Sequence, residues 1–441
     1  MRPIPRAVPD RMRQLLQMPS IRWTYRAVMT RFRRLRETQA GILRDECCGM
    51  NLNWRPAARS SAHMAAVHWC HTRILWRKNR TRALLTTLLW PVVSPIFILR
   101  RVARHGRHVA QQFGVPLSRQ VRDLVYLAHV LYMGPRTYYY YGLYHPGRTA
   151  SASLYVQDHE ILGLLDGINR DTDHRIFENK TAFFEKCRQS GLRTIPIAAR
   201  FENGKAAFID DGGRDADWFA KPEGGRCGTG IMAFRYDGPG RYRSESGRRL
   251  SKEDVMARVA ACSLSSPYIL QERILNHADV AALVGDALST CRIVTYREPD
   301  GSEGVLPCAI FKMAARGRST DNFHTGGMAV SIDLETGVLG RGVVGAEPTT
   351  RWDVHPDTQK RVNGFQLPFW AETLALCREA HRVFKDYAFI GWDVAITDDG
   401  PMLVEGNLFW GVEAMQMAHE TPLGETPFPR VYLAHMKRQR G

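Results

Sequence analysis

The sequence predicts an α+β fold, and three observations carry this prediction. Apolar segments of strand length dominate the second half of the chain, at Tyr268–Gln271, Cys291–Tyr296, Val305–Phe311 and Ala329–Ile332. Helical patterns separate or flank them, at residues 115–144, 178–190, 252–264 and 369–386. Two further apolar runs flank Asp398-Asp399-Gly400, and Gly400 can adopt a positive φ, so residues 391–407 are predicted to form a hairpin.

The predicted hairpin brings two acidic side chains together. With its loop centred on Asp399, Asp393 lies opposite Glu405, and Asn407 shares their face because side chains alternate along a strand. The other face is apolar and pairs Val394 with Val404 and Ile396 with Met402. Directly opposed carboxylates destabilise a sheet, and a hard cation such as Mg²⁺ would compensate. The alternative is an edge hairpin whose acids point into water.

Positive charge is concentrated in the first quarter of the chain. Residues 1–110 hold 22 Lys and Arg against 4 Asp and Glu, whereas the other residues hold 39 against 40. This predicts a basic arm, with amphipathic helices over residues 11–46, on a near-neutral body. The first thirty residues do not resemble a signal peptide. Nine cysteines without CxxC pairing indicate reduced cytosolic thiols and no structural metal.

Residues 83–99 form an uncharged segment with arginines on both sides. As a helix it would span about 25 Å, short of a hydrocarbon core of about 30 Å. Pro91 and Pro95 are expected to interrupt it. We therefore predict that residues 1–110 hold the protein at the cytoplasmic face of an anionic membrane, with this segment in the interface. The alternatives are a core helix and polyanion binding; nucleic acid is disfavoured because no nucleic-acid motif is present.

Lys221 ends a predicted strand and precedes a loop rich in glycine. This loop contains Gly224, Gly225, Gly228 and Gly230. Glycines let backbone N–H groups close around phosphate oxygens, although no Gly-Lys-Ser/Thr of a Walker A loop is present. The alternative is a flexible hairpin tip.

Other polar residues stand at or within predicted strands. Gln271 and Glu272 end one strand and Asp279 follows, an arrangement that can contact a base edge and ribose hydroxyls. Arg292 lies inside a strand, where it needs a carboxylate or phosphate partner. Lys312, at the end of the next strand, can point into the same cleft. The alternatives are a surface turn for the first group and a structural salt bridge for the second.

In their order along the chain, these residues resemble the ATP-grasp superfamily. The resemblance covers roughly residues 150–424 and rests on Glu178-Asn179-Lys180, Lys221, Gln271-Glu272, Asp279, Arg292, Asp393 and Glu405-Gly-Asn407. The tyrosine-rich entry, the Asn-Lys-x-x-Phe helix and the Asp321-Asn-Phe-His-Thr-Gly-Gly327 loop are similar to the sugar-transfer-associated group, which is related to α-L-glutamate ligases. Thr320 and Asn179 depart from an arginine and a frequent aspartate at those places.

The resemblance implies two α+β lobes that grip ATP, with a basic helical extension. Its expected divisions are the extension (1–110), the N-terminal part of the catalytic body (111–177), a lid (178–270) and a metal-binding lobe (271–441). The acceptor pocket is expected to border residues 316–327 and 408–416.

The resemblance also implies roles for individual residues. The expected ATP-binding residues are Lys180, Lys221, Gly225, Gly228, Gly230, Gln271, Glu272 and Asp279. The expected ligands of Mg²⁺, or of Mn²⁺, are Asp393, Glu405 and Asn407. The expected catalytic residues are Arg292, Lys312 and Asn322.

The implied reaction joins a carboxylate to an amine through an acyl phosphate, on small-molecule or glycan-linked substrates, in polysaccharide or cell-envelope biosynthesis. The alternatives are a scaffold that binds nucleotide without ligation and a kinase-like phosphotransferase.

Overall fold

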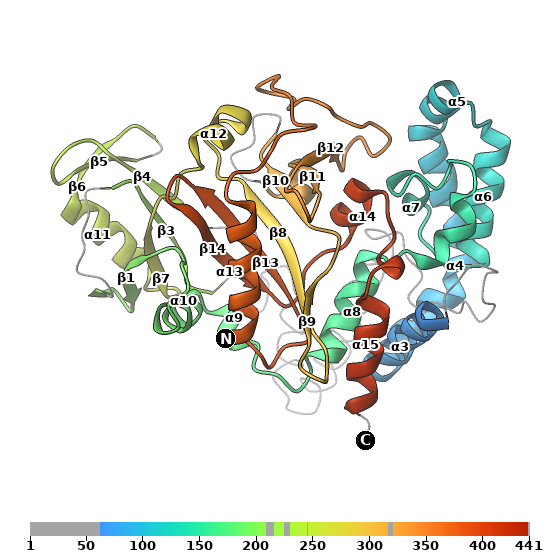
Figure 1. Ribbon diagram of the computed structural model, residues 1–441, viewed down its shortest axis with the longest axis horizontal. Helices are drawn as coiled ribbons and strands as arrows, with labels where there is room; N and C mark the ends of the chain where they lie inside the picture. Colours follow the sequence, from blue (N-terminus) through green and yellow to red (C-terminus); the bar gives the residue numbers. More distant parts are fainter. Residues whose placement is uncertain (1–61, 209–215, 225–229, 245, 316–320, 440–441) are drawn as a thin grey trace, which may run out of the picture.

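The structure is a computed structural model, and it describes residues 62–208, 216–224, 230–244, 246–315 and 321–439. The amphipathic helices predicted over residues 11–46 lie outside these residues, as do Gly225, Gly228 and Thr320. Figure 1 shows three parts in a row, with a helical region at one end, a large sheet in the middle and a second sheet at the other end.

The helical region contains most of the helices that precede residue 170. These elements are α3 (Ala62–Lys78), α4 (Arg80–Arg101), the π-helical η1 (Val102–Gly106), α5 (Arg107–Phe113), α6 (Leu117–His129), α7 (Arg136–Tyr140), the 3-10 helix η2 (Arg148–Leu154) and α8 (Asp158–Ile168). The Asn79 side chain caps α4 by accepting a hydrogen bond from the backbone N–H of Arg82. The C-terminal helix α15 (Phe428–Arg438) returns to pack on α3 and α8.

Two predictions about this region are wrong. Residues 115–144 do not form one helix. Gly134-Pro135 lies between α6 and α7, and a proline disfavours the helical conformation of the residue that precedes it. Pro91 and Pro95 do not interrupt α4, which runs through both. Both prolines lie on the exposed side of α4.

The second sheet is antiparallel, in the order β2-β1-β7-β3-β4-β5-β6. Its strands are β1 (Ile197–Glu202), β2 (Lys205–Phe208), β3 (Trp218–Pro222), β4 (Met232–Tyr236), β5 (Arg241–Ser244), β6 (Arg249–Ser251) and β7 (Tyr268–Glu272). Helix α11 (Lys252–Cys262) packs on β1, β2, β5, β6 and β7. Helix α9 (Arg175–Glu178) and helix α10 (Lys180–Gln189) lead into it, and Asn179 caps α10 while Gly191 takes a φ of 71° beyond its end.

The large sheet is also antiparallel, in the order β12-β11-β10-β8-β13-β14, with β9 paired to β8. Its strands are β8 (Thr290–Arg297), β9 (Glu303–Val305), β10 (Ile310–Met313), β11 (Met328–Ile332), β12 (Leu339–Val344), β13 (Phe389–Thr397) and β14 (Gly400–Asn407). The other elements are α12 (Ala278–Val284), η3 (Phe323–Thr325), α13 (Trp370–Val383), α14 (Glu413–His419) and η4 (Leu423–Glu425). The strand predicted over Val305–Phe311 is two strands, because Pro307 has no N–H to donate between β9 and β10.

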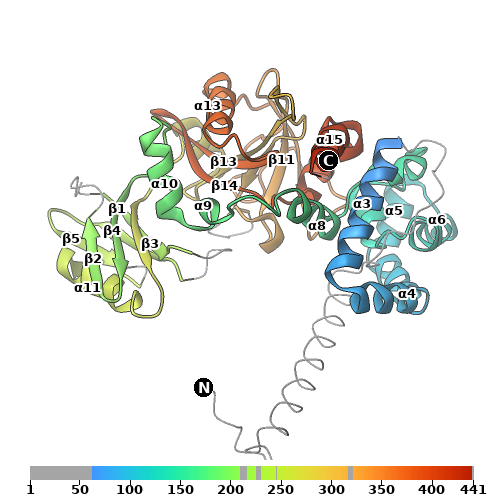
Figure 2. The same cartoon turned by 90° about the horizontal axis from the view of Figure 1, so that it is seen from below.

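Helices cover the large sheet on both faces. Helix α13 packs on β8, β13 and β14, whereas α14 packs on β10, β11 and β12. Every residue of β13 except Thr397 is buried. Seen from below, in Figure 2, the second sheet with α11 lies at the end of the molecule opposite the helical region.

The β13–β14 hairpin confirms one predicted pair and corrects the others. Asp393 lies opposite Glu405, as predicted, but Val394 pairs with Leu403 and Ile396 with Pro401. The strands are joined by only Asp398 and Asp399, with Gly400 beginning β14 at a φ of 106°. A bulge between Asp393 and Val394 then takes up one extra residue on β14, so the predicted register holds only beyond it.

Candidate functional site

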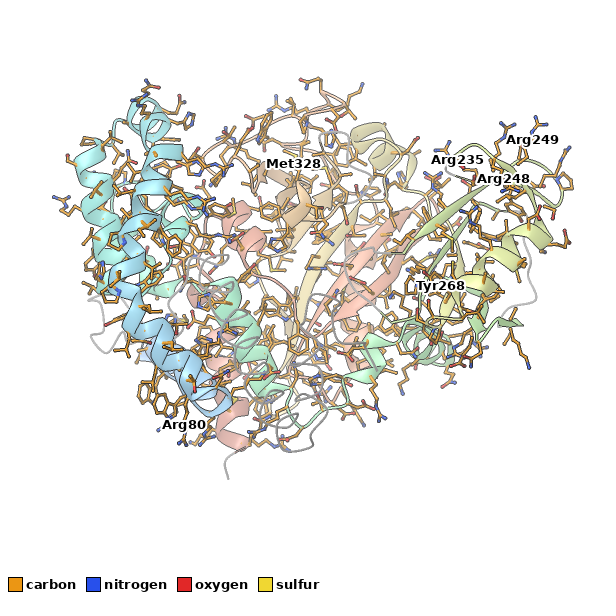
Figure 3. The ribbon with its side chains drawn as sticks, turned by 180° about the vertical axis from the view of Figure 1, so that it is seen from behind. Arg80, Arg235, Arg248, Arg249, Tyr268 and Met328 are labelled. Atoms are coloured by element: carbon orange, nitrogen blue, oxygen red, sulfur yellow. The ribbon has the colours of Figure 1, made fainter. Side chains whose placement is uncertain are left out.

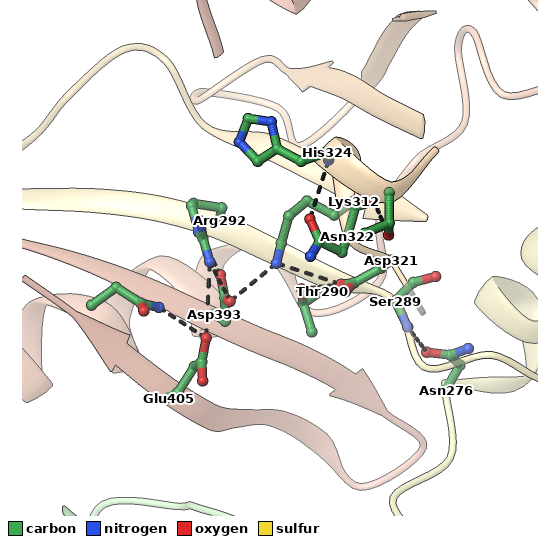
Figure 4. Close-up of polar contacts among 12 residues, drawn as sticks. Asn276, Ser289, Thr290, Arg292, Lys312, Asp321, Asn322, His324, Asp393 and Glu405 are labelled. Carbon is green, nitrogen blue, oxygen red and sulfur yellow. Dashed lines mark hydrogen bonds and ion pairs between the residues drawn. The ribbon is translucent and has the colours of Figure 1, made fainter. Parts of the chain in front are cut away.

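The centre of the site is a carboxylate held by two cations from neighbouring strands. Asp393 on β13 lies directly opposite Arg292 on β8, and Lys312 comes from β10 on the far side of β8. Arg292 donates from Nε and Nη2 to the two oxygens of Asp393, at 2.7 and 2.5 Å, and Lys312 Nζ donates to Oδ2 at 3.0 Å (Figure 4). Both cationic side chains therefore converge on one carboxylate.

This pairing fixes the charge of Asp393. The residue is only 4% exposed, but Arg292 and Lys312 hold the pKa of its carboxyl group well below its usual range against the effect of burial. The Asp393–Glu405 pair therefore does not need a bound cation to compensate its repulsion, which corrects the argument made from the hairpin alone. The salt bridge considered as an alternative role for Arg292 and Lys312 is present in the structure.

Glu405 is the less paired of the two acids. Its side chain is 50% exposed, and its nearest cation is Arg292 Nη2, 4.0 Å from Oε1. Asn407 Nδ2 donates to the same oxygen at 3.1 Å. Desolvation and the charge of Asp393 raise the pKa of Glu405. A divalent cation would relieve this raised pKa, and the Glu405 carboxylate and the Asn407 amide supply the oxygen donors that Mg²⁺ prefers.

The loop after residue 320 brings another acid to this cluster. Asp321 Oδ2 accepts a hydrogen bond of 2.5 Å from the Thr290 hydroxyl and lies 3.6 Å from Lys312 Nζ. The Asn322 side chain caps η3 by accepting from the backbone N–H of His324, so in this structure it stabilises the loop. Gly327 closes the loop where a Cβ would lie 2.9 Å from the backbone oxygens of Asp321 and Asn322. Sequence reasoning named this loop but did not single out Asp321.

Two lysines form a positive site beside Glu405. Lys180, at the start of α10, donates to the backbone oxygens of Pro222 and Glu223 at 3.2 and 3.3 Å. Burial and the nearby charge of Lys180 lower the pKa of Lys221, on β3, to about 8, and Glu405 acts in the opposite direction. Burial also lowers the pKa of Lys180, and the negative charge of Glu405 acts to raise it. A bound anion would stabilise both ammonium groups.

The other predicted nucleotide residues lie around β7 and α12. Gln271 is buried and donates to the backbone oxygen of Ile195 at 3.3 Å, while Glu272 ends β7. Asp279 is exposed in the first turn of α12, 3.7 Å from the His277 ring. Gly230 has a φ of 79°, and a Cβ there would lie 2.9 Å from the Tyr268 hydroxyl.

A second group of ionisable residues was not predicted. Ligand atoms of Asp158, His324 and Glu413 lie within 4.8 Å of one another. Arg136 pairs with both oxygens of Glu413, and Asp158 Oδ1 accepts the backbone N–H groups of Val412 and Glu413 at 2.9 and 3.0 Å.

Burial raises the pKa of Glu413 to about 7 despite Arg136. Its partners Arg136 and Asp158 lie far away in the sequence. The sequence therefore pointed to Glu413 only through the expectation that residues 408–416 border the acceptor pocket. One loop contributes to both groups: Asp321 belongs to the Asp393 cluster, and His324 belongs to the group with Asp158 and Glu413.

The Asp393 cluster predicts a specific dependence of stability on pH. Asp393→Asn is expected to lower the free energy of unfolding at pH 7 by about 3 kcal/mol, because two buried cations lose their counter-charge. The pKa of Asp393 is depressed on folding, so its carboxylate stabilises the protein above the unfolded pKa of about 3.9, and this contribution is lost as the pH falls through the lower folded pKa. The difference between wild type and variant should therefore shrink below about pH 4.

Urea unfolding at pH 7, 5 and 3 measures this difference. Asp399→Asn, at the exposed tip of the same hairpin, is the matched control and should change stability little at any of these pH values. A difference for Asp393→Asn that stays constant from pH 7 to pH 3 would contradict the assignment.

One family model matches a large part of the chain. A family model described as sugar-transfer associated ATP-grasp matches residues 164–427, which is more than half of the chain. A search of curated proteins finds no match.

Several solved structures are similar over part of the chain. D-alanine–D-alanine ligase from Bacillus anthracis is 11% identical over 60% of this chain and 70% of its own, with a TM-score of 0.35. The L-amino acid ligase from Bacillus licheniformis is 9% identical over 58% and 48%, with a TM-score of 0.33. The ADP complex of N5-carboxyaminoimidazole ribonucleotide synthetase is 11% identical over 53% and 45%, with a TM-score of 0.32. The chain spans about half the length of the last two proteins. On the family match, the chain belongs to the sugar-transfer associated ATP-grasp family and has the ATP-grasp fold.

Proposed function

We propose that the protein is an ATP- and Mg²⁺-dependent ligase that joins a carboxylate to an amine. One arrangement carries this proposal: Lys180, on α10, donates to the backbone oxygens of Pro222 and Glu223 next to Lys221 on β3, and the charge of Glu405 on the large sheet opposes the lowering of the pKa of both lysines. A candidate cation ligand therefore faces a candidate phosphate site across the two lobes. A nucleotide triphosphate with its metal ion satisfies both charges at once.

In this proposal residues 178–270, which hold all of the second sheet except the last two residues of β7, form the lid, and residues 271–441 form the metal-bearing lobe. Lys180, Lys221 and the glycine loop, with Gly225, Gly228 and Gly230, bind the phosphates of ATP. Gln271 and Glu272 lie against adenine, and Asp279 binds the ribose. Closing the lid excludes water from the transferred phosphoryl group.

We assign the metal to Glu405 and Asn407, with Asp393 as a third ligand that also keeps its contact with Arg292. Bound Mg²⁺ would neutralise charge on the β- and γ-phosphate oxygens. Mn²⁺ has the same preference for oxygen ligands and is an alternative. Arg292 and Lys312 would stabilise charge on the γ-phosphoryl group, and the Asn322 loop would place the acceptor beside them.

No side chain acts as a nucleophile in this mechanism. A carboxylate oxygen of the substrate attacks the γ-phosphorus, and the bond to ADP breaks. A neutral amine nitrogen then attacks the acyl carbon, phosphate leaves, and the amine loses a proton to give the amide. The protein positions the reactants and supplies electrostatic stabilisation.

We further propose small-molecule or glycan-linked substrates in polysaccharide or cell-envelope biosynthesis, at the cytoplasmic face of the membrane. The family description supports an association with sugar transfer. Two other functions use the same ATP and metal ligands: a kinase-like phosphotransferase with a hydroxyl acceptor, and a scaffold that binds nucleotide without ligation.

Trapping with hydroxylamine distinguishes these functions. Purified protein, ATP, Mg²⁺ and a deproteinised cell extract are incubated with hydroxylamine, and products are analysed by mass spectrometry. We expect ADP release and a hydroxamate, because hydroxylamine captures an acyl phosphate. A stable phosphate ester would identify the kinase, and no ADP with any extract would identify the scaffold.

Glu405→Gln tests the metal site. We expect metal-dependent ADP formation to fall at least about a thousandfold, because the variant loses the carboxylate that offsets the charge of the cation. Glu405 is half exposed, so the melting temperature should change little. Glu335→Gln, at an exposed turn of the same lobe, is the matched control and should retain full turnover. Retained turnover in Glu405→Gln would refute the assignment.

The pKa of Lys221, about 8, predicts how nucleotide affinity depends on pH. Phosphate binds the protonated form, so affinity should be constant below pH 8 and fall up to about tenfold per unit above it. Binding at pH 8.5 should also take up a proton, which calorimetry in buffers of different ionisation enthalpy measures. Lys221→Arg keeps the charge at all these pH values and should reduce the uptake. Equal uptake in wild type and variant would exclude Lys221 as the source.

A further inference from the structure

Helix α4 exposes a continuous apolar stripe. Between Arg82 and Arg100, every residue that is exposed in the structure is apolar: Leu84, Leu88, Leu89, Pro91, Val92, Pro95, Ile96 and Leu99. At 100° per residue these positions cover roughly half of the helix circumference and follow it for about 25 Å. Leu88 is 72% exposed and Val92 71% exposed, so the stripe has no cover among the described residues.

The opposite face of α4 is packed on the protein. Trp90 is fully buried and its indole N–H donates to the backbone oxygen of Ala128 on α6 at 2.7 Å. Ser94, Phe97 and Ile98 are also buried on this side. Among the described residues, only the continuous helix Arg80–Phe113 is long and apolar enough to cross a membrane, and a third of its most apolar window is buried. If α4 crossed a membrane, the polar groups of α6 that contact it, such as His129 beside Ser94, would be exposed to lipid. The packing therefore favours a helix that lies along the membrane surface.

Positive charge surrounds the stripe. Arg77, Lys78, Arg80 and Arg82 precede it, and Arg100, Arg101, Arg104 and Arg107 follow it, while residues 62–110 contain no Asp or Glu. The Arg80 guanidinium lies 5.9 Å from the centre of the Trp76 ring, which is itself partly exposed. In Figure 3, Arg80 lies at the end of the molecule opposite Arg248 and Arg249 of the second sheet. An apolar stripe between basic ends is complementary to lipid chains beneath anionic headgroups.

We propose that the α4 stripe docks in the plane of an anionic phospholipid bilayer. This inference rests on the membrane location proposed above and is independent of the ligase reaction. Charge complementarity favours lipid over the two other occupants. The first alternative occupant is the N-terminal segment, residues 1–61, which holds 13 Lys and Arg against 4 Asp and Glu. The second is another copy of the chain, which would bring the same basic helix ends together. Either occupant would place positive charge against the basic ends of α4.

Co-sedimentation of the full-length protein with vesicles tests the proposal. Vesicles of phosphatidylcholine with about a third phosphatidylglycerol should bind the protein, and affinity should fall with salt. Leu88→Glu/Val92→Glu should weaken binding at least about tenfold, because two apolar contacts are lost and two like charges face the headgroups. The matched control is Leu264→Glu/Leu275→Glu, which makes the same charge change at residues 71% and 61% exposed outside the helical region, and it should bind as wild type does.

Three results would overturn the proposal. Equal binding by the stripe variant and wild type would mean that the stripe does not dock and that the basic arm alone binds. Absence of vesicle binding at low salt would exclude a lipid partner. A dimer in sedimentation velocity without lipid, dissociated by the stripe variant, would identify a second copy as the occupant. ADP formation in the same preparations without vesicles reports the ligase proposal separately, and the stripe variant should leave it unchanged.

Discussion

The pairing of Asp393 with Arg292 and Lys312 is the constraint on which the candidate site depends. A buried carboxylate is costly unless cations and hydrogen bonds compensate it, and here both cations come from β8 and β10, within the same sheet. The antiparallel register sets Arg292 directly opposite Asp393, so the fold of the sheet and the charge of the site are fixed together. Because both cations are paired with Asp393, the half-exposed carboxylate of Glu405 stays available for another partner.

The sequence predicted the Asp393–Glu405 pair because the alternation of side chains is a local property. It did not predict the bulge that restores this pair after a two-residue turn. Beside the bulge, β14 contacts a distant segment: the backbone N–H of Leu403 donates to the backbone oxygen of Arg193 at 2.9 Å, and the Thr194 hydroxyl donates to the carbonyl of Leu403 at 2.9 Å. Thr194 and Leu403 are 209 positions apart, and such a contact cannot be read from the residues of the hairpin. The apolar pairs predicted from the hairpin alone therefore differ from the observed pairs by one residue.

Some charged residues of the site could be predicted from their place beside an apolar strand, and others could not. Lys221 was found because it ends a strand before a loop rich in glycine. Arg292 was found because an arginine inside an apolar strand needs a partner, and Lys312 because it ends the next strand. The group of Arg136, Asp158 and Glu413 was not found, because each residue stands at the start of a helix, where a charged side chain is ordinary. Only the return of the chain after β14 brings Glu413 against the helical region. That contact makes the helical region part of the expected acceptor side of the site.

The position of α4 bears on how a bound enzyme could still move. The helical region and the second sheet lie at opposite ends of the molecule in two perpendicular views, with the large sheet between them (Figures 1 and 2). A membrane bound through α4 would fix the position of the helical region. The large sheet would be fixed with it, because α15 packs on the helical region and α14, just before α15 in the chain, packs on β10, β11 and β12. The second sheet takes no part in that contact. In the proposed function the second sheet is a lid that opens to exchange nucleotide, so anchoring at the far end would restrain the lobe that carries Glu405 and would leave the lobe that carries Lys221 free to close.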